Sequence, residues 1–148
     1  MPIDILKYNR QLLSKSNIVF CGRKSNNPEH IGLGNPFSHK SNSHAIFQVN
    51  SLEESLTSYR KWLWKLLKAY RADKITTLEL WEMVYLNRIW HLAKLIEEKK
   101  VSGLMCFCVK INNYKYSKSK EIKCHTQILY GACIWINNNS PSISLKHN

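Results

Sequence analysis

Three cysteines and one histidine in the second half of the chain are the residues best suited to chemistry. Cys106 and Cys108 alternate along an apolar run that Gly103 opens, and Cys124-His125 follows a basic loop. If the run is a strand, both cysteine side chains point to the same face of the sheet. The four side chains are soft ligands in the number that tetrahedral zinc requires. They form a candidate zinc site, although Cys-x-Cys differs from the usual Cys-x-x-Cys motif: Cys106, Cys108, Cys124 and His125.

Cys124 and His125 could also act without a metal, as catalytic residues. They stand at the predicted start of a helix, where free N–H groups and the helix dipole attract anions and lower the pKa of a thiol. Cys124 is then a candidate nucleophile, and His125 a candidate acid or base near neutral pH. The simpler alternative places the thiols in the core and makes His125 a residue that caps the helix.

A second group of polar and aromatic residues indicates a ligand pocket in the first third of the chain. The planar guanidinium of Arg23 suits a phosphate group. The loop Gly34-Asn35-Pro36-Phe37 could approach a ligand closely, with an amide from Asn35 and a stacking face from Phe37. The predicted ligand-binding residues are Arg23, Gly34, Asn35 and Phe37. The alternative is that this loop is a tight structural turn.

The charge of the chain favours an anionic partner. With 22 Lys and Arg against 10 Asp and Glu, the formal net charge is +12. Such a charge is typical of proteins that bind a nucleotide or nucleic acid, although a merely basic surface would give the same composition. A loop in which tyrosines alternate with lysines suits phosphate contact and base stacking, and its candidate nucleic-acid contacts are Lys115, Lys118, Lys120 and Lys123. A predicted helix adds a face that could be a phosphate-binding row or an ordinary solvated surface, formed by Lys61, Lys65 and Lys68.

Length and composition indicate one folded domain. The chain has 148 residues, of which 44% are hydrophobic, enough for a core without disulfides. No apolar run reaches the roughly 18 residues that cross a bilayer, and the start of the chain lacks the pattern of a secretion signal. Five cysteines are an odd number, which fits thiols in a reducing compartment better than disulfides. We therefore expect a cytoplasmic protein with no membrane contact.

The periodicity of the apolar residues predicts an α/β fold. Strands are expected at 4–8, 18–22 and 103–111, and the long apolar run of the third favours a strand covered on both faces, as in parallel sheets. Helices with capping boxes should begin at Ser51 and Thr76, and a third should occupy 124–136. The buried stripe of the first is expected at Leu52, Leu56, Tyr59, Leu63, Leu66 and Tyr70. Together these elements predict a single domain over 1–136, a short and mostly parallel sheet packed by about three helices, with a flexible polar tail at 137–148.

Five short motifs occur in a fixed order over about residues 3–136. They are Gly22-Arg23, Gly34-Asn35-Pro36-Phe37, Tyr59 with Trp62-Leu63, Cys106-Phe107-Cys108, and Cys124-His125. This order resembles the domain-of-unknown-function family forty-three twenty-six, small proteins of bacteria, archaea and their phages. The resemblance implies an α/β fold, a site at these motifs and a phage or mobile-element role; it implies no established activity.

The chain departs from that family in two places. The family continues Cys-His-Gly-Asp, whereas here Thr126-Gln127 follows His125, so an expected carboxylate is replaced by an amide. If the carboxylate serves as a base or nucleophile, the chemistry of this chain is altered or lost. The loop between Cys108 and Cys124 is also longer and more basic than in the family.

Two functional hypotheses follow. The first is a pocket protein that binds a nucleotide or nucleotide-derived ligand and could process it by glycosidic or phosphate chemistry. The second is a non-catalytic basic module that binds nucleic acid and could be stabilised by zinc.

Overall fold

The computed structural model describes residues 3–24, 27–39, 46–106, 114–115, 122 and 124–139. Its strands are β1 (Asp4–Lys7), β2 (Ile18–Phe20), β3 (Phe37–Ser38), β4 (Phe47–Gln48), β5 (Gly103–Cys106) and β6 (Tyr114–Lys115). Its α-helices are α1 (Leu52–Arg71), α2 (Leu80–Glu97) and α3 (His125–Asn138). Short 3-10 helices lie at Leu12–Ser14, Pro28–His30 and Ile75–Thr77.

The main sheet confirms the predicted α/β class. Its strand order is β2-β5-β1-β6, with β5 parallel to both β2 and β1, and β6 antiparallel at the edge. All four residues of β5 are buried, as expected for a central parallel strand. A separate pair, β3 and β4, is also parallel.

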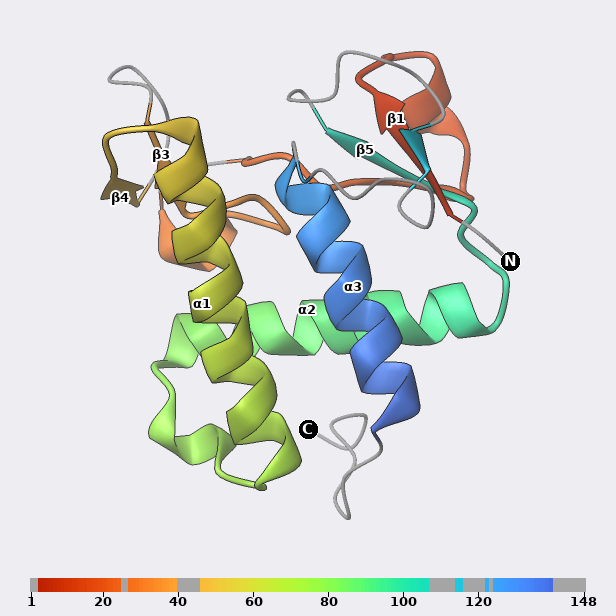
Figure 1. Ribbon diagram of the computed structural model, residues 1–148. Helices are drawn as coiled ribbons and strands as arrows, with labels where there is room; N and C mark the ends of the chain where they lie inside the picture. Colours follow the sequence, from red (N-terminus) through yellow and green to blue (C-terminus); the bar gives the residue numbers. More distant parts are fainter. Residues whose placement is uncertain are drawn as a thin grey trace.

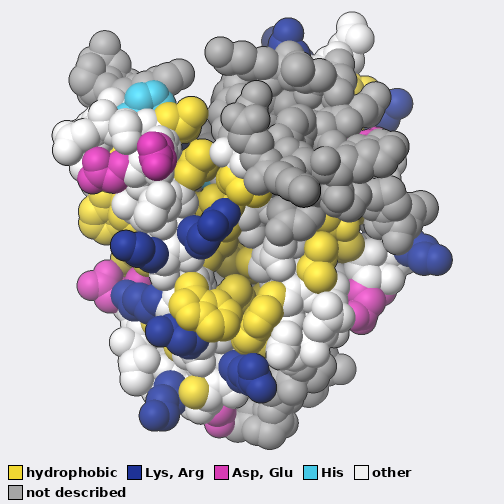
Figure 2. Space-filling model, in the orientation of Figure 1, with side chains coloured by type: hydrophobic (Ala, Val, Ile, Leu, Met, Phe, Trp, Pro, Cys, Tyr) yellow, Lys and Arg dark blue, Asp and Glu magenta, His cyan; other side chains and the backbone are white. Residues whose placement is uncertain are grey.

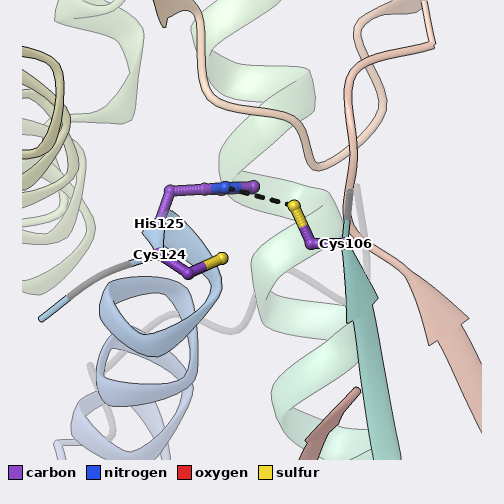
Figure 3. A group of neighbouring side chains, drawn as sticks. All are labelled: Cys106, Cys124 and His125. Carbon is purple, nitrogen blue, oxygen red and sulfur yellow. Dashed lines mark hydrogen bonds between the residues drawn. The ribbon is translucent and has the colours of Figure 1, made fainter. Parts of the chain in front are cut away.

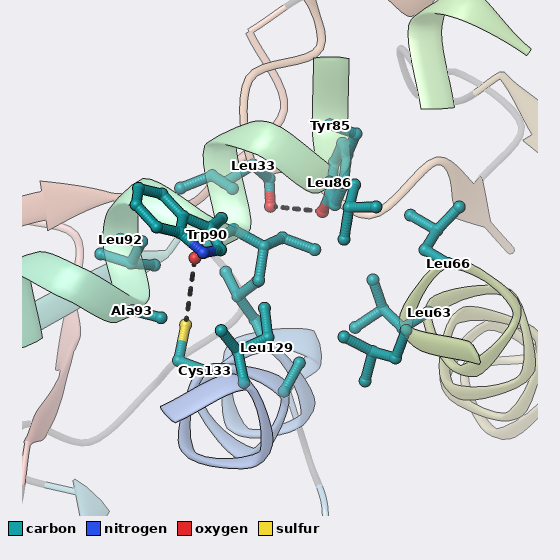
Figure 4. Close-up of a cluster of buried hydrophobic side chains, with 14 of the residues drawn as sticks. Leu33, Leu63, Leu66, Tyr85, Leu86, Trp90, Leu92, Ala93, Leu129 and Cys133 are labelled. Carbon is teal, nitrogen blue, oxygen red and sulfur yellow. Dashed lines mark hydrogen bonds between the residues drawn. The ribbon is translucent and has the colours of Figure 1, made fainter. Parts of the chain in front are cut away.

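The three α-helices form a layer next to the main sheet. In Figure 1, α1 and α3 run side by side across α2, and the start of α3 lies beside the end of β5. Fully buried side chains from all three helices meet in one core, among them Tyr59, Leu66, Ile89 and Leu129, and Figure 4 shows part of this cluster. None of the described helices is long and apolar enough to cross a membrane.

The predicted start of the first helix is confirmed, with one change in the cap. Ser51 is the N-cap, and its Oγ accepts a hydrogen bond of 3.0 Å from the N–H of Glu54. The carboxylate of Glu54 accepts from the N–H of Asn50, one residue before the position that a capping box uses. Four residues of the predicted stripe are buried, as expected: Tyr59, Leu63, Leu66 and Tyr70. Leu52 is 46% exposed, whereas Trp62 and Leu67 are buried beside Leu63 and Leu66.

The second and third helices differ from the prediction at their ends. The predicted capping box at Thr76 is wrong because Thr76 and Thr77 belong to the 3-10 turn, where the Thr77 hydroxyl donates to the Lys74 carbonyl. The α2 helix begins at Leu80, and the capping box is formed by Glu79 and Glu82. At the other end, α3 extends two residues into the predicted tail. The Asn137 amide donates to the Ala93 carbonyl at 3.0 Å, which attaches this last turn to α2.

Glu82 is a buried carboxylate that joins α1 to α2. It is 3% exposed, and its Oε2 accepts hydrogen bonds of 2.8 Å from both Trp62 Nε1 and Lys65 Nζ. Its Oε1 accepts from the Glu79 N–H at 3.0 Å. Burial opposes the ionisation of Glu82, but these donors outweigh it and hold the pKa of the carboxyl below its ordinary value.

We expect the stability of the domain to fall in acid partly through Glu82. Because its pKa is lowered in the folded state, its contribution is complete above the unfolded pKa of about 4.3 and is lost as the pH falls through the folded value. Replacing Glu82 by Gln should cost about 1–3 kcal/mol at neutral pH and flatten the dependence of stability on pH in the acid range. Urea unfolding at neutral and acid pH measures both effects. The control is Glu97→Gln on the exposed side of α2; equal losses in the two variants would contradict this role of Glu82.

Candidate functional site

Three of the four predicted zinc ligands meet at the end of β5. Cys106 is the last residue of β5, Cys124 is the N-cap of α3, and His125 is the first residue of that helix. Their potential ligand atoms all lie within 4.8 Å of one another, and the three residues are 3–5% exposed. Figure 3 shows the side chains converging from the two elements. Cys108 lies outside the described residues.

The imidazole of His125 is held in one orientation. Its Nε2 lies 2.7 Å from the Cys21 carbonyl oxygen and 3.2 Å from that of Leu33. Carbonyl oxygens only accept hydrogen bonds, so Nε2 carries a proton. Nδ1 lies 3.8 Å from the Cys106 sulfur, and the ring of Tyr59 packs edge to face against the imidazole at 5.3 Å between centroids.

Burial and sulfur act in opposite directions on His125. Burial disfavours the imidazolium, but the interactions of the ring with Cys106 and Cys124 outweigh this effect and raise the pKa of His125 well above its usual value. The thiols of Cys21 and Cys133 lie outside this group of ligand atoms, and burial raises the pKa of both. The catalytic roles of Cys124 and His125 stay predictions.

Gln127, the departure from the resembling family, closes the start of α3. Its Oε1 accepts a hydrogen bond of 3.1 Å from the Cys124 N–H. The Cys124 sulfur in turn accepts from the N–H of Thr126 at 3.4 Å. The cysteine and the glutamine thus form a capping box, and Gln127 is fully buried. The amide at this position therefore has a structural role that is independent of catalysis.

The loop at 32–35 packs against the same histidine. Its four successive carbonyl oxygens each accept a hydrogen bond from a side chain. The Gly32 carbonyl accepts from Arg88, and the Asn35 carbonyl accepts from Arg23. The Leu33 carbonyl accepts from both His125 and Tyr85. The Tyr85 hydroxyl also donates to the Gly34 carbonyl. Figure 4 shows the bond from Tyr85 to Leu33. The loop is therefore fixed by donors from α2, from α3 and from the segment after β2.

The predicted ligand-binding residues lie together, and their polar groups are used within the protein. Asn35 is 5% exposed; its Nδ2 donates to Ser55 Oγ, and its Oδ1 accepts from the Phe37 N–H, both at 2.9 Å. The Phe37 ring stacks on Phe47 at 5.1 Å, and the Arg23 guanidinium donates to the Asn35 carbonyl at 2.9 Å. These contacts support the alternative of a structural turn.

Gly34 allows two chain segments to touch. A Cβ atom at this position would lie 2.4 Å from the Cα of Arg23, closer than two non-bonded carbon atoms approach. The close approach that the sequence suggests for Gly34 is therefore made by Arg23, whose backbone also pairs with that of Gly32.

The structure has a groove between α1 and α3 that was not predicted from the sequence. It has a volume of about 450 Å³, and its lining comes from both helices: Arg60, Lys61, Leu63, Trp64, Leu67, Ile128, Gly131, Ala132 and Trp135. Trp64 is 46% exposed and meets Trp135 edge to face at 5.6 Å. A usable signal was present: Trp62 and Trp64 are two residues apart in a helix and cannot both face the core.

The lysines predicted to contact nucleic acid lie in different parts of the structure. Lys61, Lys65 and Lys68 are exposed on α1, and Lys65 forms an ion pair with Glu82. Lys115 belongs to β6 at the edge of the sheet. Lys118, Lys120 and Lys123 lie outside the described residues.

No family model, no curated protein and no solved structure matches this chain. The resemblance to the domain of unknown function therefore stays a prediction, and function must be argued from the site and the surface.

Replacing Gly34 by Ala tests whether the glycine is needed for packing. The added methyl group collides with the backbone of Arg23, so we expect a loss of about 1–3 kcal/mol in unfolding free energy. Gly131→Ala is the matched control inside α3, where alanine should stabilise the helix by up to about 1 kcal/mol. Thermal and urea unfolding compare the two. If Gly34→Ala is as stable as the wild type, packing does not require the glycine, and contact with a ligand again becomes the explanation for it.

Proposed function

We propose that this protein binds single-stranded nucleic acid along the groove between α1 and α3. The observation that carries the proposal is an exposed tryptophan, Trp64, in an apolar groove whose α1 side carries a row of cations. Proteins that bind single strands without strong sequence preference combine a basic groove with aromatic side chains on which bases stack.

The cations and the tryptophan share one face of α1. Arg60, Trp64, Lys68 and Arg71 recur at intervals of three or four residues, which places them in one stripe along the helix. The three cations are exposed, and Lys61 joins Arg60 at the groove. In Figure 2, Lys and Arg side chains lie around a hollowed apolar patch between the helices. The stripe therefore offers phosphate contacts beside a stacking surface.

The length of the stripe favours a nucleic-acid strand over a mononucleotide as the ligand. Eleven residues separate Arg60 from Arg71, and at 1.5 Å per residue this is about 16 Å. A single nucleotide would occupy the groove and leave the far cations without a phosphate, whereas successive phosphates of a strand would reach them. Unpaired bases can stack on an indole, and bases inside a duplex cannot, so we expect a preference for single strands.

The basic loop is a second candidate for contact with nucleic acid. Its lysines, at 115, 118, 120 and 123, supply four of the 22 positive charges of a chain whose net charge is +12. Their contribution stays a prediction from composition, and neutralising all four should weaken binding and reduce its dependence on salt.

The direct test is binding of labelled oligo(dT) and oligo(U), followed by fluorescence anisotropy at several salt concentrations. The double variant Lys61→Gln, Lys68→Gln should bind more weakly and reduce the slope of log affinity against log salt by about 1.4, since each phosphate contact contributes about 0.7. Trp64→Ala should weaken binding about 5- to 150-fold, the value of one stacked base. The comparison of the two oligonucleotides tells DNA from RNA.

The matched control is Lys15→Gln, Lys99→Gln, which removes the same charge at exposed sites away from the groove. It should bind nearly as the wild type does. Absence of salt-sensitive binding in the wild type, or equal losses in the two double variants, would exclude the α1–α3 interface. A duplex of equal length that competes as well as the single strand would exclude the stacking argument.

A further inference from the structure

We propose that Cys106, Cys124 and His125 bind one Zn²⁺ ion that links the end of β5 to the start of α3. The three ligand atoms already lie within 4.8 Å of one another. In tetrahedral zinc, bonds of about 2.3 Å to sulfur and 2.0 Å to nitrogen place ligand atoms about 3.5–3.8 Å apart. The separation of 3.8 Å between Cys106 Sγ and His125 Nδ1 fits this geometry.

The second nitrogen of His125 supports the assignment independently. A histidine that binds a metal generally donates its other ring N–H to a carboxylate or a backbone carbonyl, which fixes the tautomer. Here Nε2 donates to the Cys21 carbonyl at 2.7 Å, with the Leu33 carbonyl at 3.2 Å. In the neutral imidazole the proton therefore stays on Nε2, and the lone pair of Nδ1 is directed toward the Cys106 sulfur, as a zinc ligand requires.

The charge of the ligands is compatible with a buried Zn²⁺ ion. Two thiolates and one neutral imidazole carry a charge of −2, which Zn²⁺ neutralises. Binding would release one proton from each thiol and, where the imidazole is charged, the proton on Nδ1; bonds to zinc would replace these bonds to hydrogen. Cys124 is the N-cap of α3 and accepts from the Thr126 N–H, so its sulfur lies at the positive end of the helix dipole.

The ligand set selects zinc over harder cations. Thiolate and imidazole ligands suit Zn²⁺, whereas Mg²⁺ and Ca²⁺ require oxygen. The thiols of the other described cysteines are not part of the ligand group: Cys21 Sγ lies 3.7 Å from the Val19 carbonyl and Cys133 Sγ 3.9 Å from that of Ile89. They therefore provide matched cysteines outside the cluster.

Metal content tests the proposal on the full chain, purified under reducing conditions with Zn²⁺ supplied. Native mass spectrometry should show one zinc per chain, and a chelator should remove it and lower the melting temperature. Titration of the metal-free protein with Co²⁺ should give the intense visible absorption of tetrahedral thiolate-bound cobalt. Both the mass measurement and the cobalt titration use the wild-type protein, so they do not depend on whether a variant folds.

Cys124→Ser is the decisive variant because serine is a good N-cap and keeps an acceptor for the start of α3. It should fold, lose at least about tenfold in zinc affinity and lose the cobalt spectrum. Cys133→Ser, a buried cysteine outside the cluster, should keep both. A metal-free wild type that gives no cobalt spectrum would overturn the proposal, and so would equal zinc binding by Cys124→Ser and the wild type. These readings are independent of oligonucleotide binding, so either proposal can fail alone.

Discussion

The buried carbonyl oxygens of the loop at 32–35 are the constraint on which the rest of the structure depends. Within the described part of the chain this segment has no strand pairing beyond the single bridge between Gly32 and Arg23, and a buried acceptor without a donor costs about 1–3 kcal/mol. The chain meets the requirement with side chains, because four successive carbonyls receive donors from Arg23, Tyr85, Arg88 and His125. Since Tyr85 and Arg88 come from α2 and His125 from α3, satisfying the loop also fixes two helices relative to each other.

The candidate zinc site follows from this constraint. The carbonyls of Cys21 and Leu33 hold the Nε2 edge of His125, so its opposite edge must face the end of β5, where Cys106 lies. Tyr59 closes the remaining side, and its hydroxyl lies 2.8 Å from that of Tyr85, which donates to the loop. Backbone acceptors thus place the His125 ring opposite Cys106 before any ion is added.

The sequence predicted the features that depend on local patterns. Apolar periodicity identified the helices, the continuous apolar run identified β5 as a covered parallel strand, and Ser51 marked the first cap. The convergence of Cys106 with Cys124 and His125 was also predictable, because strand ends and helix starts meet at the carboxyl edge of a parallel sheet. Contacts between distant residues were not predictable: Tyr85 and Leu33 are 52 positions apart, and nothing local distinguishes an Asn35 that binds a ligand from one that donates to Ser55.

The α3 helix connects the two proposed sites without making them dependent on each other. Its first turn carries Cys124 and His125, and its later turns supply Gly131 and Trp135 to the groove. Loss of an ion at the first turn would affect the groove only if the helix as a whole moved. The distal end is attached separately, since Asn137 donates to the Ala93 carbonyl and Leu129 and Cys133 are fully buried in the core. Packing along α2 therefore keeps the groove wall in place, and zinc should change the stability of the domain more than its affinity for a single strand.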